Sequence, residues 1–368
     1  MKRHPALFEP IQVGSLKLAN RIVVAPMCQY SAENGRMNDW HLIHLGQLAV
    51  SGAALLTIEA TSVLPEGRIT WADVGLWNDE TEMAMRLTLD RIRRWSDMPI
   101  AIQLNHAGRK ASTEVPWAGG AHIASNVPNG WRTEAPSSIP YSEDDAPPRA
   151  LDRDGLRKIR DAFVASAMRA RNVGIDLIQL HCAHGYLLHQ FLSPLSNQRD
   201  DEYGGSLENR MRYPMEVFEA VREAFPDRPV TVRLSATDWV DGGWDTEQSC
   251  VFAEMLQARG CDGIHISSGG LHPAQKIPVG PSYQVPLARI VKSKVSMPVV
   301  AVGLITGFEQ AEAIVATREA DMIALARTIL YDPRWPWHAA AELGAQVHAP
   351  KQYLRSQPWR FKALFDSE

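Results

Sequence analysis

Cysteine, excess charge and long apolar runs are all scarce in this sequence. Among 368 residues there are four cysteines, at positions 28, 182, 250 and 261. They form no CxxC pair and no regular framework, which argues against a disulfide-rich domain and predicts a reduced, cytoplasmic protein. The 38 basic residues are balanced by 42 acidic ones. The chain therefore lacks the basic surplus of a nucleic-acid-binding protein, and we expect no such partner.

No apolar run reaches the roughly 20 residues that a membrane-spanning helix needs, so we expect no membrane partner. The first residues, MKRHPALFEPIQVG, lack the apolar stretch of a signal peptide. What the sequence does have is apolar side chains, at 45% of positions, which is enough for a large buried core. The length is normal for an α/β barrel with insertions, and no linker marks a second domain. We therefore predict a single domain over residues 1–368.

Short runs rich in valine, isoleucine and leucine recur along the chain. Runs that are apolar on both faces are typical of buried parallel strands. Helical patterns separate several of them, at residues 153–173, 207–225, 246–259, 285–294 and 308–317. This alternation predicts a (β/α)8 barrel of the TIM type; the rival, a doubly wound sheet, usually has fewer strands. The predicted strands are residues 21–26, 54–60, 99–106, 176–183, 230–236, 263–269, 298–303 and 322–327.

Two segments stand outside this alternation. Residues 107–152 follow the third strand and are rich in proline, glycine, serine and charged residues. This composition predicts a long loop insertion with a short hairpin. Loops of this length in compact domains are usually functional or disordered. Before the first strand, FEPIQVGSLKLANR alternates around Gly14 and predicts a hairpin that closes the lower end of the barrel.

Barrel enzymes carry their chemistry at the carboxyl ends of the strands, and two of these ends suggest an anion site. Gly303 follows the seventh strand and lets backbone N–H groups approach a ligand closely. Arg327 follows the eighth strand and can hold phosphate oxygens with its planar guanidinium. Either residue alone would more often be a turn glycine or a surface arginine. Together, at the two expected loops, they predict a phosphate site.

The segment HCAHGY at the end of the fourth strand has three interpretations. A metal site would need at least one further ligand, which the segment does not supply. A core role would suit one isolated histidine better than two. In the third interpretation, His181 and His184 are neutral imidazoles that donate to one substrate oxygen, and Tyr186 gives a proton as general acid. We favour the third, which suits a substrate that becomes enolate-like.

Several motifs resemble the Old Yellow Enzyme family of FMN-dependent ene-reductases, and in particular its bacterial subclass that includes xenobiotic reductases. The similarity runs nearly from end to end, and the segment that contains DEYGGSLENR is highly specific. The matching motifs are APMCQY (25–30), HAGRKAS (106–112), HCAHGYLLHQFLSPLSNQRDDEYGGSLENRMRY (181–213), RLSATDW (233–239) and QYLR (352–355).

The resemblance implies noncovalent FMN at the mouth of a (β/α)8 barrel. His181 and His184 would bind the substrate carbonyl, with Tyr186 as proton donor and Tyr30 as a further substrate contact. Arg355 would reach the site of a neighbouring subunit from a tail at residues 345–368, although a solvated tail is the commoner role of a C-terminal arginine. The residues implied to bind FMN are Ala25, Pro26, Met27, Cys28, Ala60, Gln103, Arg233, Gly303, Ala326 and Arg327.

The resemblance also implies a reaction. NADPH, or alternatively NADH, reduces FMN and leaves, and hydride then passes from flavin N5 to the β-carbon of an α,β-unsaturated carbonyl in ping-pong turnover. Nitro compounds are further implied substrates, no protein-bound metal is expected, and the subunits would form a homodimer or homotetramer. Cys28 resembles a cysteine that tunes the flavin, against the simpler role of a small buried hydrophobe.

Three positions depart from the family pattern. Ala326 stands where glycine usually precedes the phosphate-binding arginine, Asn105 where alanine is common, and Val302 where some relatives carry an aromatic residue. These differences bear on how closely the backbone approaches the phosphate and on which substrate is preferred, more than on the type of reaction. Two other classes remain as alternatives: a barrel hydrolase with a metal on His181 and His184, and a noncatalytic flavin-binding protein.

Overall fold

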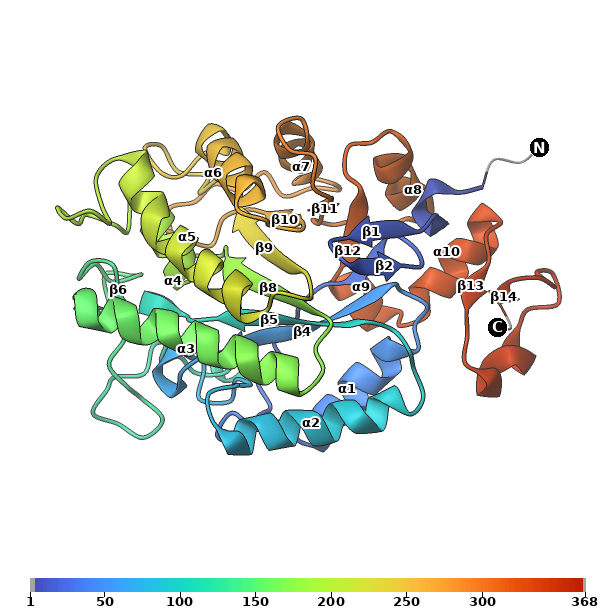
Figure 1. Ribbon diagram of the computed structural model, residues 1–368, viewed down its shortest axis with the longest axis horizontal. Helices are drawn as coiled ribbons and strands as arrows, with labels where there is room; N and C mark the ends of the chain where they lie inside the picture. Colours follow the sequence, from blue (N-terminus) through green and yellow to red (C-terminus); the bar gives the residue numbers. More distant parts are fainter. Residues whose placement is uncertain (1–3, 367–368) are drawn as a thin grey trace.

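The computed structural model describes residues 4–366 and contains a closed barrel of parallel strands. The last strand of the barrel pairs with the first, for example Ala324 with Val23, and this pairing closes the sheet. The barrel lies at the centre of the molecule in Figure 1. Each predicted strand is confirmed, and so is the (β/α)8 fold. The barrel strands are β3 (Ile22–Val24), β4 (Leu55–Ser62), β5 (Ile100–Asn105), β8 (Leu177–Cys182), β9 (Val230–Ser235), β10 (Ile264–Ser267), β11 (Val299–Ala301) and β12 (Met322–Leu325).

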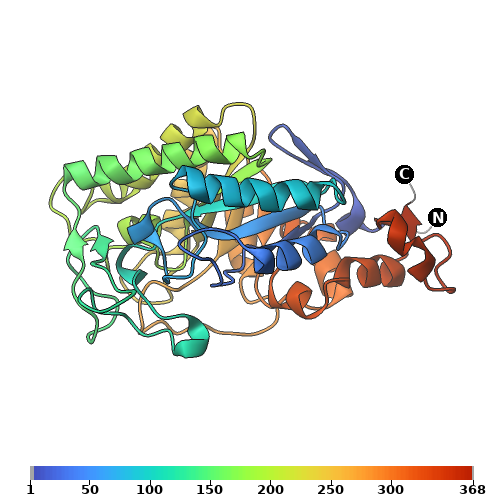
Figure 2. The same ribbon diagram turned by 90° about the horizontal axis from the view of Figure 1, so that it is seen from below.

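Helices cover the outside of the barrel (Figures 1 and 2). The five predicted helical segments are confirmed, and α3 shows the local reason. Asp152 caps its first turn by accepting from the Gly155 N–H, while Leu156, Ile159 and Phe163 are buried on one face. Helices α1 and α2 were not predicted. The helices are α1 (Asp39–Ala49), α2 (Asp79–Arg93), α3 (Arg153–Asn172), α4 (Leu187–Leu192), α5 (Leu207–Ala224), α6 (Thr246–Ala258), α7 (Val285–Lys292), α8 (Phe308–Ala316), α9 (Arg327–Tyr331) and α10 (Trp335–Leu343).

The predicted N-terminal hairpin is present as β1 (Ile11–Val13) and β2 (Leu16–Leu18), which pair antiparallel. Its buried side chains Val13 and Leu18 pack with Val23, Leu55 and Leu177 inside the barrel. The hairpin therefore closes one end of the barrel interior with apolar surface, and the chemistry is left to the other end.

Residues 107–152 form the long insertion after β5, and they contain little regular structure. The prediction of a hairpin there is wrong, because β6 and β7 run parallel. Arg149 N–H donates to Thr133 O and Leu151 N–H to Ala135 O, so the chain has to loop round before it returns in the same direction. The elements are η3 (Gly108–Lys110), η4 (Pro116–Ala118), β6 (Glu134–Ala135) and β7 (Arg149–Ala150).

The C-terminal tail packs on α10, at the side of the molecule away from the insertion (Figure 1). Its two short strands pair with one another, and the Phe365 ring lies 4.8 Å from that of Trp337. Arg355 is exposed to solvent. The elements of the tail are β13 (Val347–His348), η5 (Lys351–Ser356) and β14 (Phe365–Asp366), and two further short helices are η1 (Ala6–Phe8) and η2 (Pro65–Gly67).

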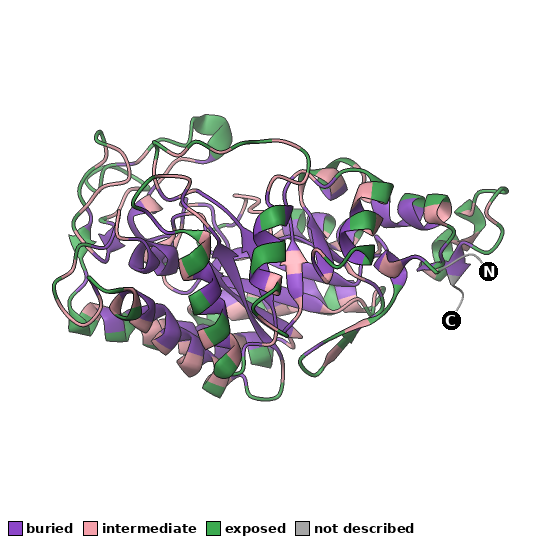
Figure 3. Ribbon diagram, turned by 90° about the horizontal axis from the view of Figure 1, so that it is seen from above, coloured by how far each residue is buried: buried purple, intermediate pink, exposed green. Residues whose placement is uncertain are grey.

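Burial follows the layers of the fold (Figure 3). The strands and the inward faces of the helices form one large apolar cluster, and the lower barrel interior forms a second. Within residues 4–366, no helix is both long and apolar enough to cross a bilayer.

Candidate active site

The upper end of the barrel interior is polar, unlike the lower end. The register places His181 on β8, Arg233 on β9 and His265 on β10 side by side, and all three are buried. Their neighbours Cys182 and Ile266 belong to the apolar layer beneath the helices. The two-residue alternation of a strand therefore sends the polar side chains inward at this level and the apolar ones outward.

His181 and His184 meet where β8 ends. Their ring centroids are 5.1 Å apart and the rings are nearly perpendicular, at 89°. His184 has a φ of 58°, in the left-handed region that most L residues avoid. Contacts from distant segments hold it there: its N–H donates to Ser235 Oγ at 3.0 Å, and its carbonyl accepts from Lys110 Nζ at 2.9 Å. The surrounding fold thus fixes a backbone conformation that the local sequence does not favour.

The contacts of the two rings indicate where their protons can lie. Ala183 N–H donates to His181 Nδ1 at 3.3 Å, which places the ring proton of His181 on Nε2. That Nε2 lies 3.4 Å from His184 Nδ1, and His184 Nε2 lies 2.7 Å from Ser267 Oγ. A serine hydroxyl both donates and accepts, so Ser267 can support either neutral form of His184. With its proton on Nδ1, His184 would present a second donor beside that of His181.

Both imidazoles are held neutral. Burial lowers the pKa of His181 and of His184 well below the usual value, and the nearby positive charge of Arg233 lowers both further. Neutral imidazole N–H groups in a buried site can stabilise negative charge that develops on an oxygen atom. The pair therefore suits a substrate carbonyl.

Tyr186 lies beside the pair, directly before α4. Its ring centroid is 4.9 Å from that of His181, and Lys110 Nζ lies 5.3 Å from the ring centre. Burial raises the pKa of the Tyr186 phenol well above its usual value, chiefly through desolvation. The phenol keeps its proton until a strongly basic atom arrives, and the ammonium of Lys110 is close enough to stabilise the phenolate that would remain.

The segment after β3 brings Cys28 and Tyr30 to the same region. Cys28 packs with Ala60, Ile69 and Tyr186 in a small apolar cluster, and burial raises the pKa of its thiol well above the usual value. Tyr30 lines a cavity of about 470 Å³ together with Arg109, Lys110 and Tyr141. Ala25 is buried at the end of β3, and its N–H donates to Leu325 O at 2.9 Å, whereas Pro26 and Met27 are half-buried.

Beneath this segment lies a buried carboxyl group, Glu59. It accepts the Gln29 N–H at 2.8 Å, and its other oxygen lies 3.6 Å from His41 Nε2. Burial, together with the negative charge of Asp73, raises the pKa of Glu59 to about 8. Burial lowers the pKa of His41 to about 4, so the pair is uncharged at neutral pH. Glu59 thus helps to position the loop that carries Cys28.

Replacement of Glu59 by glutamine should flatten the dependence of stability on pH. The folded protein holds a proton on Glu59 that the unfolded chain releases above about pH 4.5, so the contribution of Glu59 is full below that pH and is lost as the pH rises through about 8. Between about pH 7 and 9 the Glu59→Gln variant should lose a few degrees less in Tm than the unaltered protein. The pKa of Asp73, about 6, places its titration below this window.

Thermal unfolding followed by circular dichroism measures the effect. Glu80→Gln is the matched control, because Glu80 is exposed and pairs with Arg36 at the surface. Melting temperatures that fall in parallel for the Glu59→Gln variant and the unaltered protein would contradict the assignment.

A cavity of about 170 Å³ lies at the carboxyl ends of β11 and β12. Arg233, Gly303, Ala326 and Arg327 line it together with Gln284. Arg233 is a buried cation whose Nε has no hydrogen-bond partner, and no carboxylate within the described chain lies at ion-pair distance from it. Burial lowers the pKa of Arg233 only to about 10, so it stays charged at neutral pH. The cavity therefore suits a ligand that carries negative charge.

Three residues implied by the resemblance, Gln103, Ala60 and Arg355, do not line these two cavities. Gln103 is buried on β5, where its Nε2 donates to Gln179 Oε1 at 2.8 Å inside the barrel. Ala60 lies beside the flavin-tuning candidate Cys28. Arg355 lies on the exposed tail and, within this one chain, is not among the residues that line the two cavities described above.

The sequence did not identify several residues that support the pair. Lys110 belongs to the motif HAGRK, but its contacts with His184 O and Gly270 O span 74 and 160 residues. Ser267 stands in the SSGG segment at the end of the sixth predicted strand, and this position at a strand end was its only signal. Gln284, whose Oε1 accepts from Ser268 Oγ at 2.7 Å, lies in a loop and gave no signal. Over residues 4–366, no group of three or more His, Cys, Asp and Glu side chains is arranged to hold a metal ion.

The sequence model of the NADH:flavin oxidoreductase / NADH oxidase family matches residues 6–346. An NADPH dehydrogenase of Geobacillus thermodenitrificans is 41% identical over 357 residues, which cover 96% of this chain and 99% of that protein. An NADH:flavin oxidoreductase of Gibberella zeae is 41% identical over 375 residues, which cover 97% of this chain and 89% of that protein. Among solved structures, morphinone reductase in complex with tetrahydroNAD has a TM-score of 0.75 at 28% identity, with 97% of this chain and 94% of that chain covered.

Proposed function

Because the chain belongs to the NADH:flavin oxidoreductase / NADH oxidase family, we propose that it is an FMN-dependent ene-reductase that takes its electrons from NADPH. Membership confirms the resemblance to the Old Yellow Enzyme family, and the chain is an oxidoreductase with FMN as cofactor. The observation that carries the finer assignment is the meeting of two neutral imidazoles and a protonated phenol at one end of the barrel.

The residues at the upper end of the barrel fit FMN. The cavity at Gly303 and Arg327 suits a phosphate group, and the unpartnered guanidinium of Arg233 lies between that cavity and His181. A cation at this position would stabilise negative charge on the reduced flavin. Cys28 and Ala60 would lie along the ring, as the resemblance implies. Ala326 keeps its backbone N–H, so its methyl group does not remove the contact that a glycine would offer.

Each side chain of the site has a part in the reaction. When bound, FMN supplies the hydride that reduces the β-carbon of the substrate. His181 and His184 donate to the carbonyl oxygen and stabilise the negative charge that develops there, with Ser267 as the hydrogen-bond partner of the other ring nitrogen of His184. Tyr186 gives its proton to the α-carbon, and Lys110 stabilises the phenolate until it regains a proton from water.

Absorption spectroscopy and turnover test this function together. The purified protein should be yellow, should develop a long-wavelength charge-transfer band when phenol occupies the site, and should oxidise NADPH in the presence of cyclohexenone. A colourless protein that ignores FMN would contradict the proposal, and so would a flavoprotein without enone turnover. Nitro compounds offer oxygens to the same donors and remain predicted substrates; NADH remains the alternative reductant.

Replacement of Gly303 by alanine should weaken FMN binding. Gly303 has a φ of 118°, which L residues rarely adopt, and an added Cβ would lie 2.7 Å from Gln284 Nε2 at the edge of the phosphate cavity. Strain and displacement of this size should raise the dissociation constant of FMN by about tenfold. Fluorescence titration of the apoprotein with FMN measures it.

Gly46→Ala is the matched control for this substitution. Gly46 lies in α1 with open space around it, so the change should leave FMN affinity unaltered. Equal FMN affinities for the Gly303→Ala variant and the unaltered protein would remove Gly303 from the phosphate site.

The tail supports a proposal about assembly. Tyr353 and Trp359 expose 44% and 77% of their surface next to Arg355, and exposed aromatic side chains beside an arginine are typical of contact surfaces. In a homodimer or homotetramer, Arg355 would then enter the substrate site of a neighbouring subunit. Light scattering of the full chain and of the Arg355→Ala variant, together with the KM for enone, tests this arrangement.

A further inference from the structure

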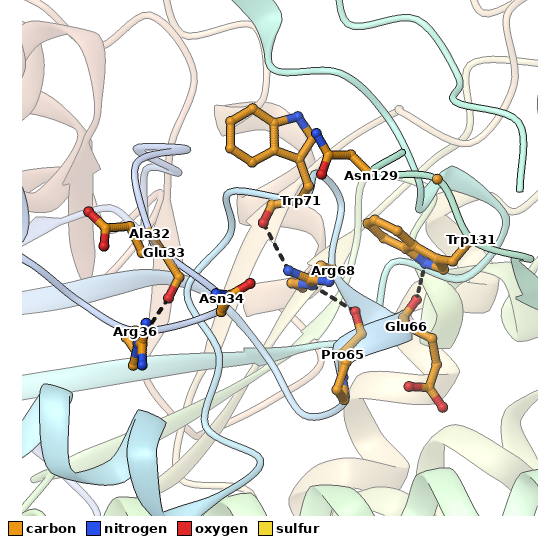
Figure 4. A pocket seen from close by; sticks show the side chains of 11 residues that line it. Ala32, Glu33, Asn34, Arg36, Pro65, Glu66, Arg68, Trp71, Asn129 and Trp131 are labelled. Carbon is orange, nitrogen blue, oxygen red and sulfur yellow. Dashed lines mark hydrogen bonds between the residues drawn. The ribbon is translucent and has the colours of Figure 1, made fainter. Parts of the chain in front are cut away.

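A second cavity opens on the same rim of the barrel and takes no part in the reaction described above. It has a volume of about 610 Å³, which is in the usual range for a small-molecule site. Its walls come from the loop after β3, the loop after β4 and the insertion after β5. Figure 4 shows Arg68 between the indoles of Trp71 and Trp131, with Arg36 on the loop that carries Glu33.

The cavity shares a wall with the cavity of about 470 Å³ that Tyr30 and Lys110 line. Ile69 and Thr70 line that first cavity, while Arg68 and Trp71, on either side of them in the chain, line the second one. The two sites are also linked by the hydrogen bond from Trp71 Nε1 to Glu114 Oε2, at 3.2 Å. A ligand long enough to pass over residues 68–71 can therefore occupy both sites at once.

Trp131 gives a second link between the two sites. It lies against the same small apolar cluster as Cys28 and Tyr186, so one wall of the second cavity borders the region of the candidate catalytic residues. Its indole N–H is taken by Glu66 O at 2.8 Å, and the Arg68 guanidinium lies over its ring at 5.0 Å, so a planar ligand would stack on the face away from Arg68.

Arg68 is a cation whose hydrogen bonds go to backbone carbonyl groups. Its Nε donates to Pro65 O at 2.8 Å and its Nη1 to Trp71 O at 2.9 Å, while its guanidinium lies over the rings of Trp131 and Trp77 at 5.0 and 5.6 Å. No carboxylate in the described part of the chain lies within ion-pair distance of it. Its Nη2 therefore remains free to bind an anion, and stacking on the rings holds the guanidinium plane in place.

Glu33, Glu66 and Arg36 are the other charged side chains that line the cavity, and Glu33 is exposed to solvent. The Glu66 carboxylate pairs with Lys158. Arg36 donates to Glu33 O at 3.3 Å and pairs with the exposed Glu80 at 3.3 Å, so it can turn toward an incoming anion at little cost. The cavity thus combines aromatic faces with two cations, a carboxylate that is paired with Lys158, and the exposed carboxylate of Glu33. That combination recognises a flat heterocycle that carries phosphate.

We infer that this cavity binds the adenosine 2′-phosphate end of NADPH while the nicotinamide lies in the substrate site. The inference rests on the proposed function, since it takes NADPH as the reductant. The adenine would stack on an indole, and the 2′-phosphate would accept hydrogen bonds from Arg68 and Arg36. The preference for NADPH over NADH would then come from these two arginines and not from the site of hydride transfer.

Anaerobic stopped-flow reduction of the flavin by NADPH and by NADH tests the inference. In the Arg68→Met and Arg36→Met holoenzymes, the NADPH concentration that half-saturates reduction should rise by about tenfold or more, because each loses a charged hydrogen bond. The limiting rate and the half-saturating concentration of NADH should change by less than about twofold, since NADH lacks the 2′-phosphate. Arg157→Gln is the matched control, because Arg157 is exposed on α3 and pairs only with Asp154.

A probe that carries no nicotinamide gives an independent measurement. Adenosine 2′,5′-bisphosphate should quench the tryptophan fluorescence of the holoenzyme saturably, should compete with NADPH, and should bind the Arg36→Met variant more weakly. Arg36 is at the surface, so this variant should fold normally even if the Arg68 variant does not. Equal losses for NADPH and NADH, or a bisphosphate without effect, would overturn the inference. Oxidation of the photoreduced enzyme by enone needs no nicotinamide, so it reports separately on the proposed function.

Discussion

The Tyr186→Phe variant should lose most of its enone reduction and keep its reduction by NADPH. The phenol is the proton donor that the geometry offers beside the imidazole pair, with its ring 4.9 Å from that of His181. Loss of a positioned general acid should slow the oxidative half-reaction by about 10² to 10⁴. Stopped-flow mixing of the reduced enzyme with cyclohexenone measures this step alone.

The reductive half-reaction serves as the internal control for this variant, because reduction by NADPH needs no proton from Tyr186. Tyr331→Phe is the matched variant, since Tyr331 is 94% exposed at the end of α9 and should be neutral in both half-reactions. An enone step of unchanged speed in the Tyr186→Phe variant would remove the phenol from the mechanism. Proton donation would then have to come from water or another group.

The second large effect is expected for His184→Ala. This change removes one of the two donors to the carbonyl oxygen, and a lost donor of this kind should lower kcat/KM for the enone by about 10² to 10³. The alanine should also abolish the charge-transfer band with phenol, because the phenolate oxygen would lose the same donor. Flavin content should stay normal, since His184 does not line the phosphate cavity.

Ser267→Ala gives a graded test of the same site. Ser267 Oγ lies 2.7 Å from His184 Nε2 and helps to orient that ring, so its loss should reduce the enone rate by less than the loss of His184 itself. His338→Ala, a change at an exposed histidine that pairs with Asp332, should have no effect. Full enone activity in the His184→Ala variant would show that the pair does not bind the carbonyl.

The pH dependence should not come from these histidines. Burial and the charge of Arg233 lower the pKa of both rings well below the usual value, so both stay neutral through the physiological range. A rate of enone reduction that falls as the pH drops from about 8 to 6 would indicate that one ring gains a proton there, contrary to this assignment.

The sequence by itself determined the barrel. Parallel strands that are buried on both faces have sequences that are short apolar runs, and each of the eight runs lies on a barrel strand. The helices that were predicted have apolar positions at helical spacing, as in α3. The hairpin around Gly14 was also visible, because a glycine between two alternating segments is a local signal. Local patterns of this kind need no knowledge of the rest of the chain.

The motifs also named the candidate catalytic residues, because His181, His184 and Tyr186 lie within six positions of one another. The residues that contact and orient them could not be predicted from the sequence in the same way. Ser267 contacts His184 across 83 residues, and Lys110 reaches it across 74. The parallel pairing of β6 and β7 likewise depends on how a long loop returns. None of these contacts leaves a periodic pattern in the sequence.

Closure of the barrel is what decides the chemistry. It brings β8, β9 and β10 together in register, so that Arg233 lies between His181 and His265 in a region from which water is largely excluded. Desolvation and the neighbouring charge then keep the imidazoles neutral and the phenol protonated. The sequence determined which residues are present and on which strands they lie. Only the tertiary structure set their protonation and their partners, because both depend on burial and on contacts between segments far apart in the chain.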